Sequence, residues 1–365
     1  MIKVLVFLGY RHAYNADAWR NRYKNGLAND SMVYGYENYK DKKIEVNYFR
    51  FNKLERIIFK NKKIGMLYTY FIKLPLSLFF YDSVWTHFDK DGLYIAALKK
   101  IPILNKLMPT LVANFVWTID ALFSMSEKKI KIYKWLVSDI EKIVYHSEAE
   151  TTHFKNTLGC KDNHIKKIHY GINFQSFNNS ALEMCPVGFN AKRFILMVGT
   201  DIHRDLELFK WLVTQHANLS FVLCSNNPDF LNMKFETNNV EVLSADFNEM
   251  IYLYRRCMLV VIPLKDNLHV SGLTTLLESA AVKKPIVLTF TPGFEDYCLP
   301  GETCLTADVG DYAGFDAQVC RIINDEVFAR YLSERSHEFC LEKFTTHNWA
   351  KEHCLLTMEL NGAEK

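Results

Sequence analysis

The 365-residue sequence lacks the marks of several large protein classes. It has no low-complexity tract, and 49% apolar with 23% charged residues are ordinary values, which excludes disorder as its main state. The formal net charge of +3 is small and argues against a dedicated nucleic-acid-binding protein. At this length the chain forms either two domains or one large one.

Paired cysteines are also missing. The nine cysteines include no C-x-x-C pair, are widely spaced and all lie after residue 159. An odd number at such spacings favours reduced thiols in a cytosolic protein over a disulfide framework. The spacing does not support a zinc site either.

Long hydrophobic runs are absent as well. The longest apolar stretch, 66–80, is interrupted by Lys73 and Pro75 and is shorter than the roughly 20 residues that span a bilayer. The N-terminus has a short apolar run and no small-residue cleavage site, so we expect residues 3–9 to form a buried strand rather than a signal peptide. A cytoplasmic location follows as an expectation.

Aromatic residues, in contrast, are abundant, with 26 Phe and 19 Tyr. Large cores use such rings, and so do membrane-facing or sugar-binding surfaces. Residues 40–63 hold nine basic and three acidic side chains, and the aromatic stretch 66–80 follows at once. This pattern predicts either contact with an anionic membrane or a solvated turn before an ordinary core helix.

Short apolar runs alternate with longer segments of helical character, which predicts an α/β fold with mainly parallel sheets. The expected strands form two series, at 3–9, 43–51, 83–88, 111–118, 142–146 and 167–170, and then at 193–198, 220–224, 240–243, 258–263, 285–289 and 303–305. A polar break at 173–192 separates them. We therefore expect two Rossmann-like domains, 1–180 and 181–345, and a C-terminal helix within 346–365 that packs back on the first domain.

The most informative segment follows the strand at 258–263. Ser271 and Gly272 open a helix there, and free amides near Leu273 and Thr274 would hold a phosphate with help from the helix dipole. Glu278, four residues after Thr274, would accept two hydroxyls of a ribose. A nucleotide site is therefore expected at the start of this helix.

The same segment, LLESAAVKKPIVLT (276–289), resembles the retaining glycosyltransferases of the GT-B fold, in particular family 4. That family has two glutamates eight residues apart, then small residues and a Pro-Val strand, and Glu278 takes the place of the second glutamate. Five further segments resemble family motifs in the right order: VYHSEAETTHF (144–154), KIHYGINFQSF (167–177), FILMVGTDIHRDLELF (194–209), DYCLPGETCLTADVGD (296–311) and KFTTHNWAKEHCLLTMEL (343–360). The resemblance covers most of the chain and is densest after residue 143.

The resemblance implies that a nucleotide-sugar, UDP-linked in the first instance, binds the second domain and an acceptor binds the first. The sugar would pass with retention to a glycan or lipid-linked glycan at the inner face of the membrane, in surface polysaccharide biosynthesis. No Asp-x-Asp motif stands where a cation would be needed, so we expect no metal and no cofactor. The donor loop would contain Gly199, Thr200 and Arg204, with Arg204 on the diphosphate. The alternative for Arg204 is an ion pair with Asp205 at a helix start.

Two departures from the family matter. Val270 replaces the first glutamate, so His269 or Ser271 would substitute for it. The segment FVWTIDALF (115–123) lacks the family's histidine, and Asp120 is either an acceptor-side catalytic group or a helix N-cap.

Three more residues are candidates on the acceptor side. Arg11 and His12 follow the first strand, and His87 ends another, although a lone histidine is more often a packed residue. The alternative functions are a nucleotide-sugar epimerase, an inverting transferase and an inactive nucleotide-sugar-binding subunit. A periplasmic binding protein fits poorly, because it would need a signal peptide.

Overall fold

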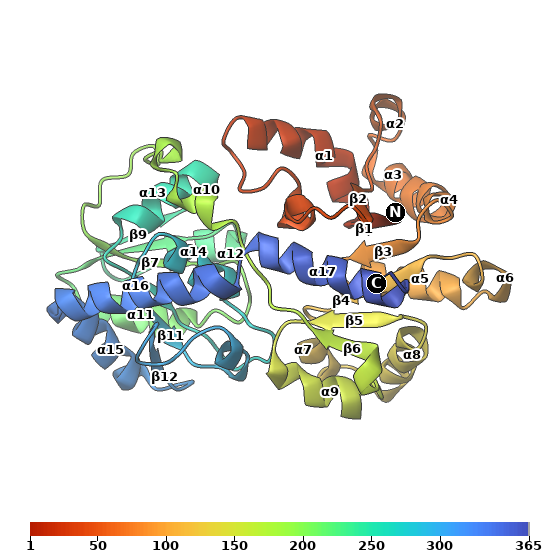
Figure 1. The fold of residues 1–365 in the computed structure, drawn as a ribbon. Coiled ribbons are helices and arrows are strands. Elements are labelled where there is room, and N and C mark those ends of the chain that lie inside the picture. The colour runs from red at the N-terminus through yellow and green to blue at the C-terminus, as the bar shows by residue number, and fades with distance from the viewer. Residues whose placement is uncertain (364–365) are drawn as a thin grey trace. The chain divides into compact units, whose positions relative to one another are not determined.

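The computed structural model describes residues 1–363, apart from the side chain of Ser180, as two compact units (Figure 1). Unit 1 contains residues 1–24, 30–170 and 346–365, and unit 2 contains 25–29 and 171–345. The chain therefore passes between the units next to Tyr170, whereas the sequence pattern suggested residue 180. Residues 174–178 of the expected linker form a helix that packs in unit 2, where Phe177 lies 5.4 Å from Phe247 between ring centroids.

Each unit is built on a six-stranded sheet in which every neighbouring pair is parallel. Unit 1 has the order β2-β1-β3-β4-β5-β6, and unit 2 has β12-β11-β10-β7-β8-β9. The strands are β1 (Ile2–Phe7), β2 (Ile44–Tyr48), β3 (Ser83–Thr86), β4 (Thr110–Asn114), β5 (Lys142–Tyr145), β6 (Ile165–Lys167), β7 (Phe194–Val198), β8 (Ser220–Cys224), β9 (Val240–Leu243), β10 (Leu259–Ile262), β11 (Ile286–Thr289) and β12 (Leu305–Ala307). Every strand expected from the sequence is present, and the predicted α/β fold with two doubly wound sheets is confirmed.

Helices connect the strands, as parallel pairing requires. In unit 1 they are α1 (Gly9–Lys24), η1 (Val33–Asn38), α2 (Lys53–Ile58), α3 (Lys62–Tyr68), η2 (Thr69–Lys73), α4 (Leu74–Leu78), α5 (Asp89–Lys99), α6 (Pro102–Asn105), α7 (Thr118–Leu122), α8 (Glu127–Val137), η3 (Glu148–Glu150), α9 (Thr151–Asn156), η4 (Asp162–His164) and α17 (Thr346–Leu360). In unit 2 they are α10 (Phe174–Asn178), η5 (Ser180–Leu182), α11 (Leu206–Gln215), α12 (Pro228–Leu231), α13 (Phe247–Arg256), α14 (Leu273–Ala281), η6 (Pro292–Asp296), α15 (Tyr312–Asn324) and α16 (Glu326–Lys343).

The core of unit 2 explains why α14 starts where it does. Alternate residues of β7 and β10 pack with α11 and α15 on one face of the sheet, among them Val261. Because successive strand residues point to opposite faces, Ile262 points to the other face. A Cβ placed on Gly272 would lie 2.6 Å from the Cγ2 of Ile262, so the start of α14 packs tightly on that second face.

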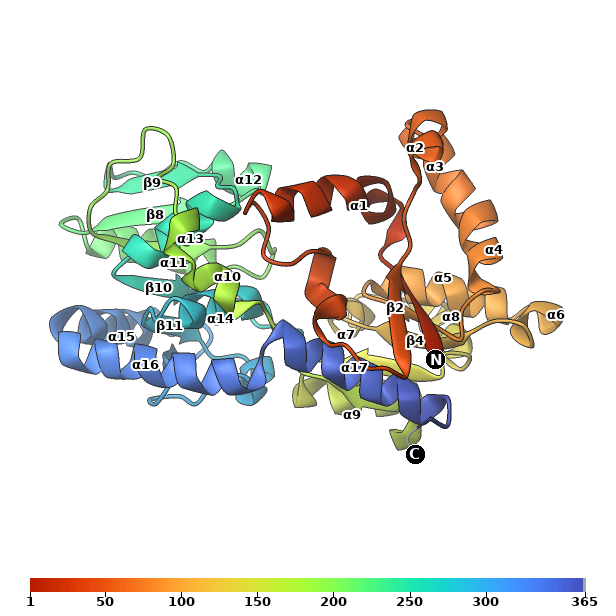
Figure 2. The same ribbon diagram turned by 45° about the horizontal axis from the view of Figure 1, so that its top comes forward.

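The core of unit 1 includes the C-terminal helix α17, which lies along the sheet in Figure 2. Trp349 is 1% exposed and joins Trp85 of β3 in one apolar cluster. The indole Nε1 of Trp85 also donates a hydrogen bond to the Oγ1 of Thr357 at 2.8 Å. The last helix is thus a structural part of unit 1.

Two boundaries in unit 1 differ from the sequence expectations. The first helix begins at Gly9, the last residue of the expected strand 3–9, because Gly9 turns the chain with a φ of 74°. A Cβ there would also lie 3.3 Å from a carboxylate oxygen of Asp91. The fourth strand ends at Asn114 rather than at Thr118, because Thr118 already begins α7.

Candidate functional site

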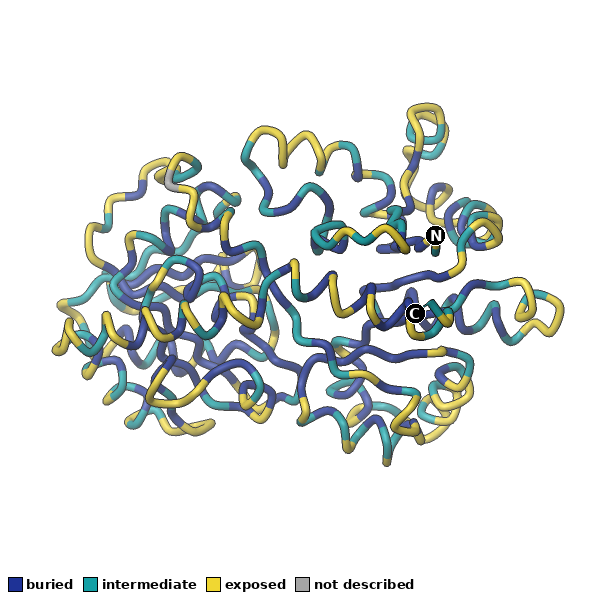
Figure 3. Tube along the Cα trace, in the orientation of Figure 1, coloured by how far each residue is buried: buried dark blue, intermediate teal, exposed yellow. Residues whose placement is uncertain are grey.

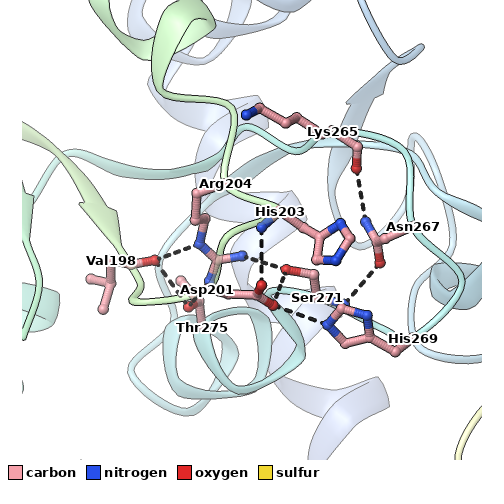
Figure 4. Close-up of polar contacts among 9 residues, drawn as sticks. All are labelled: Val198, Asp201, His203, Arg204, Lys265, Asn267, His269, Ser271 and Thr275. Atoms are coloured by element: carbon pink, nitrogen blue, oxygen red, sulfur yellow. Dashed lines mark hydrogen bonds and ion pairs between the residues drawn. The ribbon is translucent and has the colours of Figure 1, made fainter. Parts of the chain in front are cut away.

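A compact polar cluster lies in unit 2 where β7 and β10 end (Figure 4). The loop after β7 contributes Asp201, His203 and Arg204, and the segment after β10 runs through His269 to Ser271 and α14. β7 and β10 are hydrogen-bonded neighbours, so their carboxyl ends bring the two loops together. In open parallel sheets, ligands bind at this edge.

Arg204 ties the two loops together from inside the protein. It is 3% exposed, and its Nε donates to the carbonyl oxygen of Val198 at 3.1 Å. Its Nη1 donates to the Oγ of Ser271 at 3.3 Å, and its Nη2 donates to the Oγ1 of Thr275 at 3.1 Å. Burial lowers the pKa of Arg204, and nearby Asp201 raises it. The sequence placed Arg204 correctly at this loop, and its bonds commit the guanidinium to holding β7 against the start of α14.

Two glycines make room for that guanidinium. A Cβ at Gly199 would lie 2.8 Å from the Cζ of Arg204, and one at Gly272 would lie 2.8 Å from its Nη1. Gly272 also has a φ of 87°, which side-chain-bearing residues rarely adopt. The glycines predicted for the donor loop and for the helix start therefore both shape the pocket of one arginine.

Asp201 is the hub of the hydrogen bonds in the cluster. Its carboxylate accepts from the Oγ of Ser271 at 2.7 Å, from the Nε2 of His269 at 3.0 Å and from the backbone N–H of His203 at 3.0 Å. Burial raises the pKa of Asp201, but these hydrogen bonds together lower it well below its ordinary value. The hub is consequently a fixed negative charge beside the buried cation of Arg204.

The segment before α14 is held in place by its own polar side chains. Asn267 accepts the backbone N–H of Ser271 at 3.2 Å and donates to the carbonyl oxygen of Lys265 at 2.9 Å. The ring of His269 lies 4.9 Å from that of His203 in an edge-to-face arrangement. These contacts fix Ser271 directly before Gly272 and present the first turn of α14.

Glu278 lies one turn further along α14 and is partly exposed. Its carboxylate accepts the hydroxyl of Tyr254 on α13 at 2.7 Å. Burial raises the pKa of Glu278 to about 7, although the Tyr254 hydrogen bond and the charge of Arg204 lower it. A carboxyl group that changes charge near neutral pH thus stands beside the first turn of α14.

The donor-side candidates lie in the segments that follow β7 and β10, and several of them are buried. Thr200 and Thr274 are exposed, whereas Leu273 is buried with Ser271 and Gly272. Among residues 1–363, no side chain caps the start of α14, because its N-cap residue is Gly272. The backbone N–H of Leu273 donates to the carbonyl oxygen of Val270 at 3.1 Å, so this amide is not free as the sequence suggested.

The acceptor-side candidates belong to unit 1. Arg11 and His12 lie in the first turn of α1, where Arg11 is exposed and the ring of His12 stacks on Phe88 at 5.7 Å. His87 is 6% exposed, stacks on Tyr34 at 3.5 Å and accepts the hydroxyl of Tyr36 at 2.9 Å. His87 is thus a packed residue, the alternative that its isolation in the sequence favoured.

Asp120 requires a correction of its local setting. It is partly exposed and lies in the first turn of α7, not at the end of a strand, and it is not the N-cap, which is Trp117. The carboxylate of Asp89 accepts the backbone N–H groups of Val116 and Trp117 at 2.8 and 3.1 Å and the hydroxyl of Thr118 at 2.6 Å. Asp89 thereby starts α7 early and shortens the expected strand.

Sequence reasoning missed several members of the cluster. Asp201, Thr275 and Tyr254 were not singled out, and His269 was considered only as a substitute for the missing glutamate. The run DIHRD at 201–205 places two carboxylates around a histidine and an arginine in a loop after a strand, which was a usable signal. Asp205 does not pair with Arg204; its side chain accepts the N–H groups that begin α11.

The comparisons with known proteins agree with this geometry. Residues 201–325 match the family described as glycosyl transferases group 1. The capsular polysaccharide biosynthesis glycosyltransferase CapM of Staphylococcus aureus is 24% identical over 206 residues, which cover 51% of this chain and 53% of CapM, about half of that relative's length. A 2-deoxystreptamine N-acetyl-D-glucosaminyltransferase of Niallia circulans is 21% identical over 305 residues, covering 78% of this chain and 69% of that enzyme.

Solved structures extend the likeness to the whole chain. Sucrose-phosphate synthase of Thermosynechococcus elongatus gives a TM-score of 0.70 at 13% identity and covers 100% of both chains. HepE of Anabaena, in complex with UDP and glucose, gives a TM-score of 0.70 at 12% identity and covers 98% of this chain and 99% of the other. At such identities the likeness concerns the fold, and the predicted GT-B architecture is confirmed. Retention and membership of family 4 stay predictions.

Proposed function

We propose that this chain, which has the GT-B fold and matches glycosyl transferases group 1 over residues 201–325, is a nucleotide-sugar-dependent glycosyltransferase. One observation carries the proposal. The matched region begins at Asp201 and includes both loops of the polar cluster and the whole of α14. Family match and candidate site thus coincide in unit 2.

The donor binds unit 2 in this proposal. A diphosphate lies at the first turn of α14, where backbone amides and the helix dipole favour an anion. Arg204 adds a positive charge from beneath the loop, so negative charge that builds up on the leaving phosphate is stabilised by groups already in place. Glu278 accepts the ribose hydroxyls. UDP is our first choice, since the Anabaena neighbour was crystallised with UDP and with UDP-glucose.

The acceptor binds unit 1 and is a glycan or a lipid-linked glycan. Arg11, His12 and Asp120 are the acceptor-side residues of the proposal, and Asp120 is the carboxylate best suited to orient a hydroxyl. The relative CapM is named for capsular polysaccharide biosynthesis, which supports a surface polysaccharide as the end product. We place the protein in the cytoplasm at the inner face of the membrane, with transfer by retention and without a metal.

An inactive nucleotide-sugar-binding protein is the second candidate. It is favoured by Val270, which takes the position of the family's first glutamate and is 9% exposed. A Cβ on Gly293 would lie 2.8 Å from the Cγ2 of Val270, so this apolar side chain is part of a packed contact. Neither an epimerase nor an inverting enzyme has a comparable observation in its favour.

A thermal-shift panel of UDP-, GDP-, ADP- and CMP-sugars tests the donor site. We expect UDP-sugars alone to raise the melting temperature, and we expect Glu278→Gln to reduce that rise. Slow release of free sugar from the stabilising donor, resistant to EDTA, would separate the enzyme from the inactive binding protein. If none of the four classes stabilises the protein, the proposed function is wrong.

A further inference from the structure

The segment from Lys53 to Phe80, called here the apolar arm, folds into α2, α3, η2 and α4 and carries an unusual number of exposed apolar side chains (Figure 1). All of the following are at least 42% exposed: Leu54, Ile57, Ile58, Ile64, Met66, Leu67, Phe71, Ile72, Leu76, Phe79 and Phe80. Phe71 and Phe80 reach 71% and 74%. Contiguous apolar surface of this kind on a water-soluble fold marks an interaction site.

The arm is firmly attached, so this exposure does not come from a loose segment. A Cβ on Gly65 would lie 2.7 Å from the Cζ of Tyr10, and Leu74 and Leu78 are 0% and 1% exposed. The rings of Tyr68 and Phe59 stack at 3.7 Å. The inner face of the arm therefore packs on unit 1, and its outer face presents the apolar side chains to solvent.

The charges of the arm are basic. Its one acidic residue, Glu55, pairs with Lys73 at 2.5 Å, and Arg56 pairs with Asp17 at 2.8 Å. Four exposed lysines, Lys53, Lys60, Lys62 and Lys63, have no ion pair among the residues that the structure describes. Lys40 and Lys42, in the first part of the basic stretch found in the sequence, precede β2 and do not belong to the arm.

A second group of exposed apolar residues continues this surface on α6 and α8. Ile103 is 77% exposed and Trp135 is 56% exposed. Lys100, the C-cap of α5, contacts α8: its Nζ lies 4.9 Å from the Trp135 ring and donates to the Oγ of Ser138 at 2.8 Å. The exposed lysines Lys128, Lys129, Lys131 and Lys134 surround them.

The second group adjoins the arm through α5. The hydroxyl of Tyr94 on α5 donates to the carbonyl oxygen of Tyr70 in the arm, and the two rings are 5.0 Å apart. In Figures 1 and 2 the helices α4 and α6 lie on the same side of unit 1, and Figure 3 shows exposed stretches along both. The exposed lysines and apolar groups together form one docking face.

We propose that this docking face binds the surface of an anionic phospholipid bilayer. Apolar side chains with flanking lysines are the combination that inserts into the headgroup region and attracts negative lipids. A second copy of the chain would bring two sets of lysines together, which opposes self-association through this face. Among residues 1–363 no helix is long and apolar enough to cross a bilayer, so the contact we propose is peripheral.

Flotation with vesicles tests the proposal without any sugar donor, so its failure would leave the transferase proposal untouched. The full chain is mixed with vesicles of phosphatidylcholine that contain about 30 mol% phosphatidylglycerol. A parallel sample uses vesicles of phosphatidylcholine alone. We expect binding to the anionic vesicles and at least tenfold weaker binding to the neutral ones.

Two variants separate the two contributions. Lys60→Gln, Lys62→Gln and Lys63→Gln together should weaken binding to anionic vesicles roughly tenfold or more, while Phe71→Ser with Phe80→Ser should weaken it at every salt concentration. The matched control, Lys40→Gln, Lys42→Gln and Lys234→Gln, removes the same formal charge from exposed positions outside the docking face and should bind like the wild type.

Three results would overturn the proposal. Equal loss of binding in the control and in the lysine variant of the arm would reject it, because only the net charge would then matter. Failure of the wild-type protein to bind vesicles with about 30 mol% phosphatidylglycerol would also reject it. So would a dimer in light scattering that Phe71→Ser with Phe80→Ser dissociates, because the face would then bind a second copy.

Discussion

For a single residue such as Arg204, the sequence predicts the place in the chain but not the side chains that surround it. Its place after Gly199 in a strand-to-helix loop was readable from the sequence, and the family resemblance assigned that loop to a proposed nucleotide site. Its burial was not, because the side chains that surround it, Ser271 and Thr275, lie 67 and 71 residues away in the chain. The contacts that hold the Arg204 side chain are long-range, and a single sequence does not show which distant residues contact each other.

Replacing Arg204 with lysine should destabilise unit 2 by about 1–3 kcal/mol, because an ammonium cannot make the three-directional hydrogen bonds of a guanidinium. Urea unfolding measures the change. Arg193→Lys at an exposed position is the control and should be neutral. Equal stability of Arg204→Lys and the wild type would show that the fork geometry is not needed.

Glu278 should give donor binding a dependence on pH. Burial raises the pKa of Glu278 to about 7, so the carboxylate that we propose for the ribose hydroxyls is lost as the pH falls from 8 to 6. UDP affinity, measured by calorimetry, should therefore fall over this range. In the absence of donor, the raised pKa means that the protonated form of Glu278 favours the folded state at low pH. This contribution to the free energy of unfolding is lost as the pH rises through 7.

Two variants test that assignment. Glu278→Gln should bind UDP more weakly at pH 8, by roughly tenfold, and show no slope. Tyr254→Phe removes a hydrogen bond that lowers the pKa of Glu278, so the midpoint should move upward. A slope that persists in Glu278→Gln would assign the titration to another group.

At the scale of elements, buried strands were predicted well and helix starts less well. Strands such as β8 are continuous apolar runs, and their pattern needs no knowledge of the rest of the chain. Helix starts depend on distant partners: α7 begins where the Asp89 carboxylate meets its first amides, and α1 begins at Gly9 against Asp91. Local patterns alone therefore placed Asp120 on the wrong element.

Helix α17 contributes a histidine to a buried hydrogen-bond chain that makes unit 1 sensitive to acid. The Nε2 of His353 lies 3.1 Å from the Oδ1 of Asn114, the side-chain amide of Asn114 donates to the hydroxyl of Tyr36, and that hydroxyl lies 2.9 Å from the Nδ1 of His87. Burial lowers the pKa of His353 to about 3 and that of His146 to about 4, and it lowers the pKa of His87 well below its ordinary value. All three are neutral in the folded chain.

The free energy of unfolding should consequently fall as the pH drops below 6.5, where these histidines are protonated only in the unfolded chain. Each of His146 and His353 should cost about 2 kcal/mol at pH 5 relative to neutral pH. Denaturant unfolding at a series of pH values measures the slope. His353→Gln should reduce it, the exposed His347→Gln should not, and an unchanged slope in His353→Gln would contradict the assignment.

At the scale of the whole molecule, the nine cysteines differ in how far they are exposed to solvent. All are free thiols; seven are buried, Cys320 is partly buried and Cys185 is exposed. Burial raises the pKa of several of the buried thiols, including Cys224, Cys257 and Cys340, to about 12. The reduced state expected from the sequence thus agrees with a core that uses cysteine as a small apolar residue.

A thiol reagent should therefore react quickly with one cysteine of the folded protein and slowly with a second. Cys185→Ser should remove the fast phase, and the seven buried cysteines should react only after unfolding. Ellman's reagent followed by absorbance measures both phases. Rapid reaction of three or more thiols in the folded protein would contradict the described burial.

The place of α17 in the core of unit 1 has a consequence for the order in which the chain folds during synthesis. Unit 1 contains β1, yet Trp349 and Cys354, which fill its cluster, are made after the whole of unit 2. Unit 2 closes on residues up to 345 and can fold first, although it starts later. The apolar cluster of β1, β3 and β4 is thus incomplete until α17 has left the ribosome, and its apolar side chains are exposed to chaperone binding during that interval.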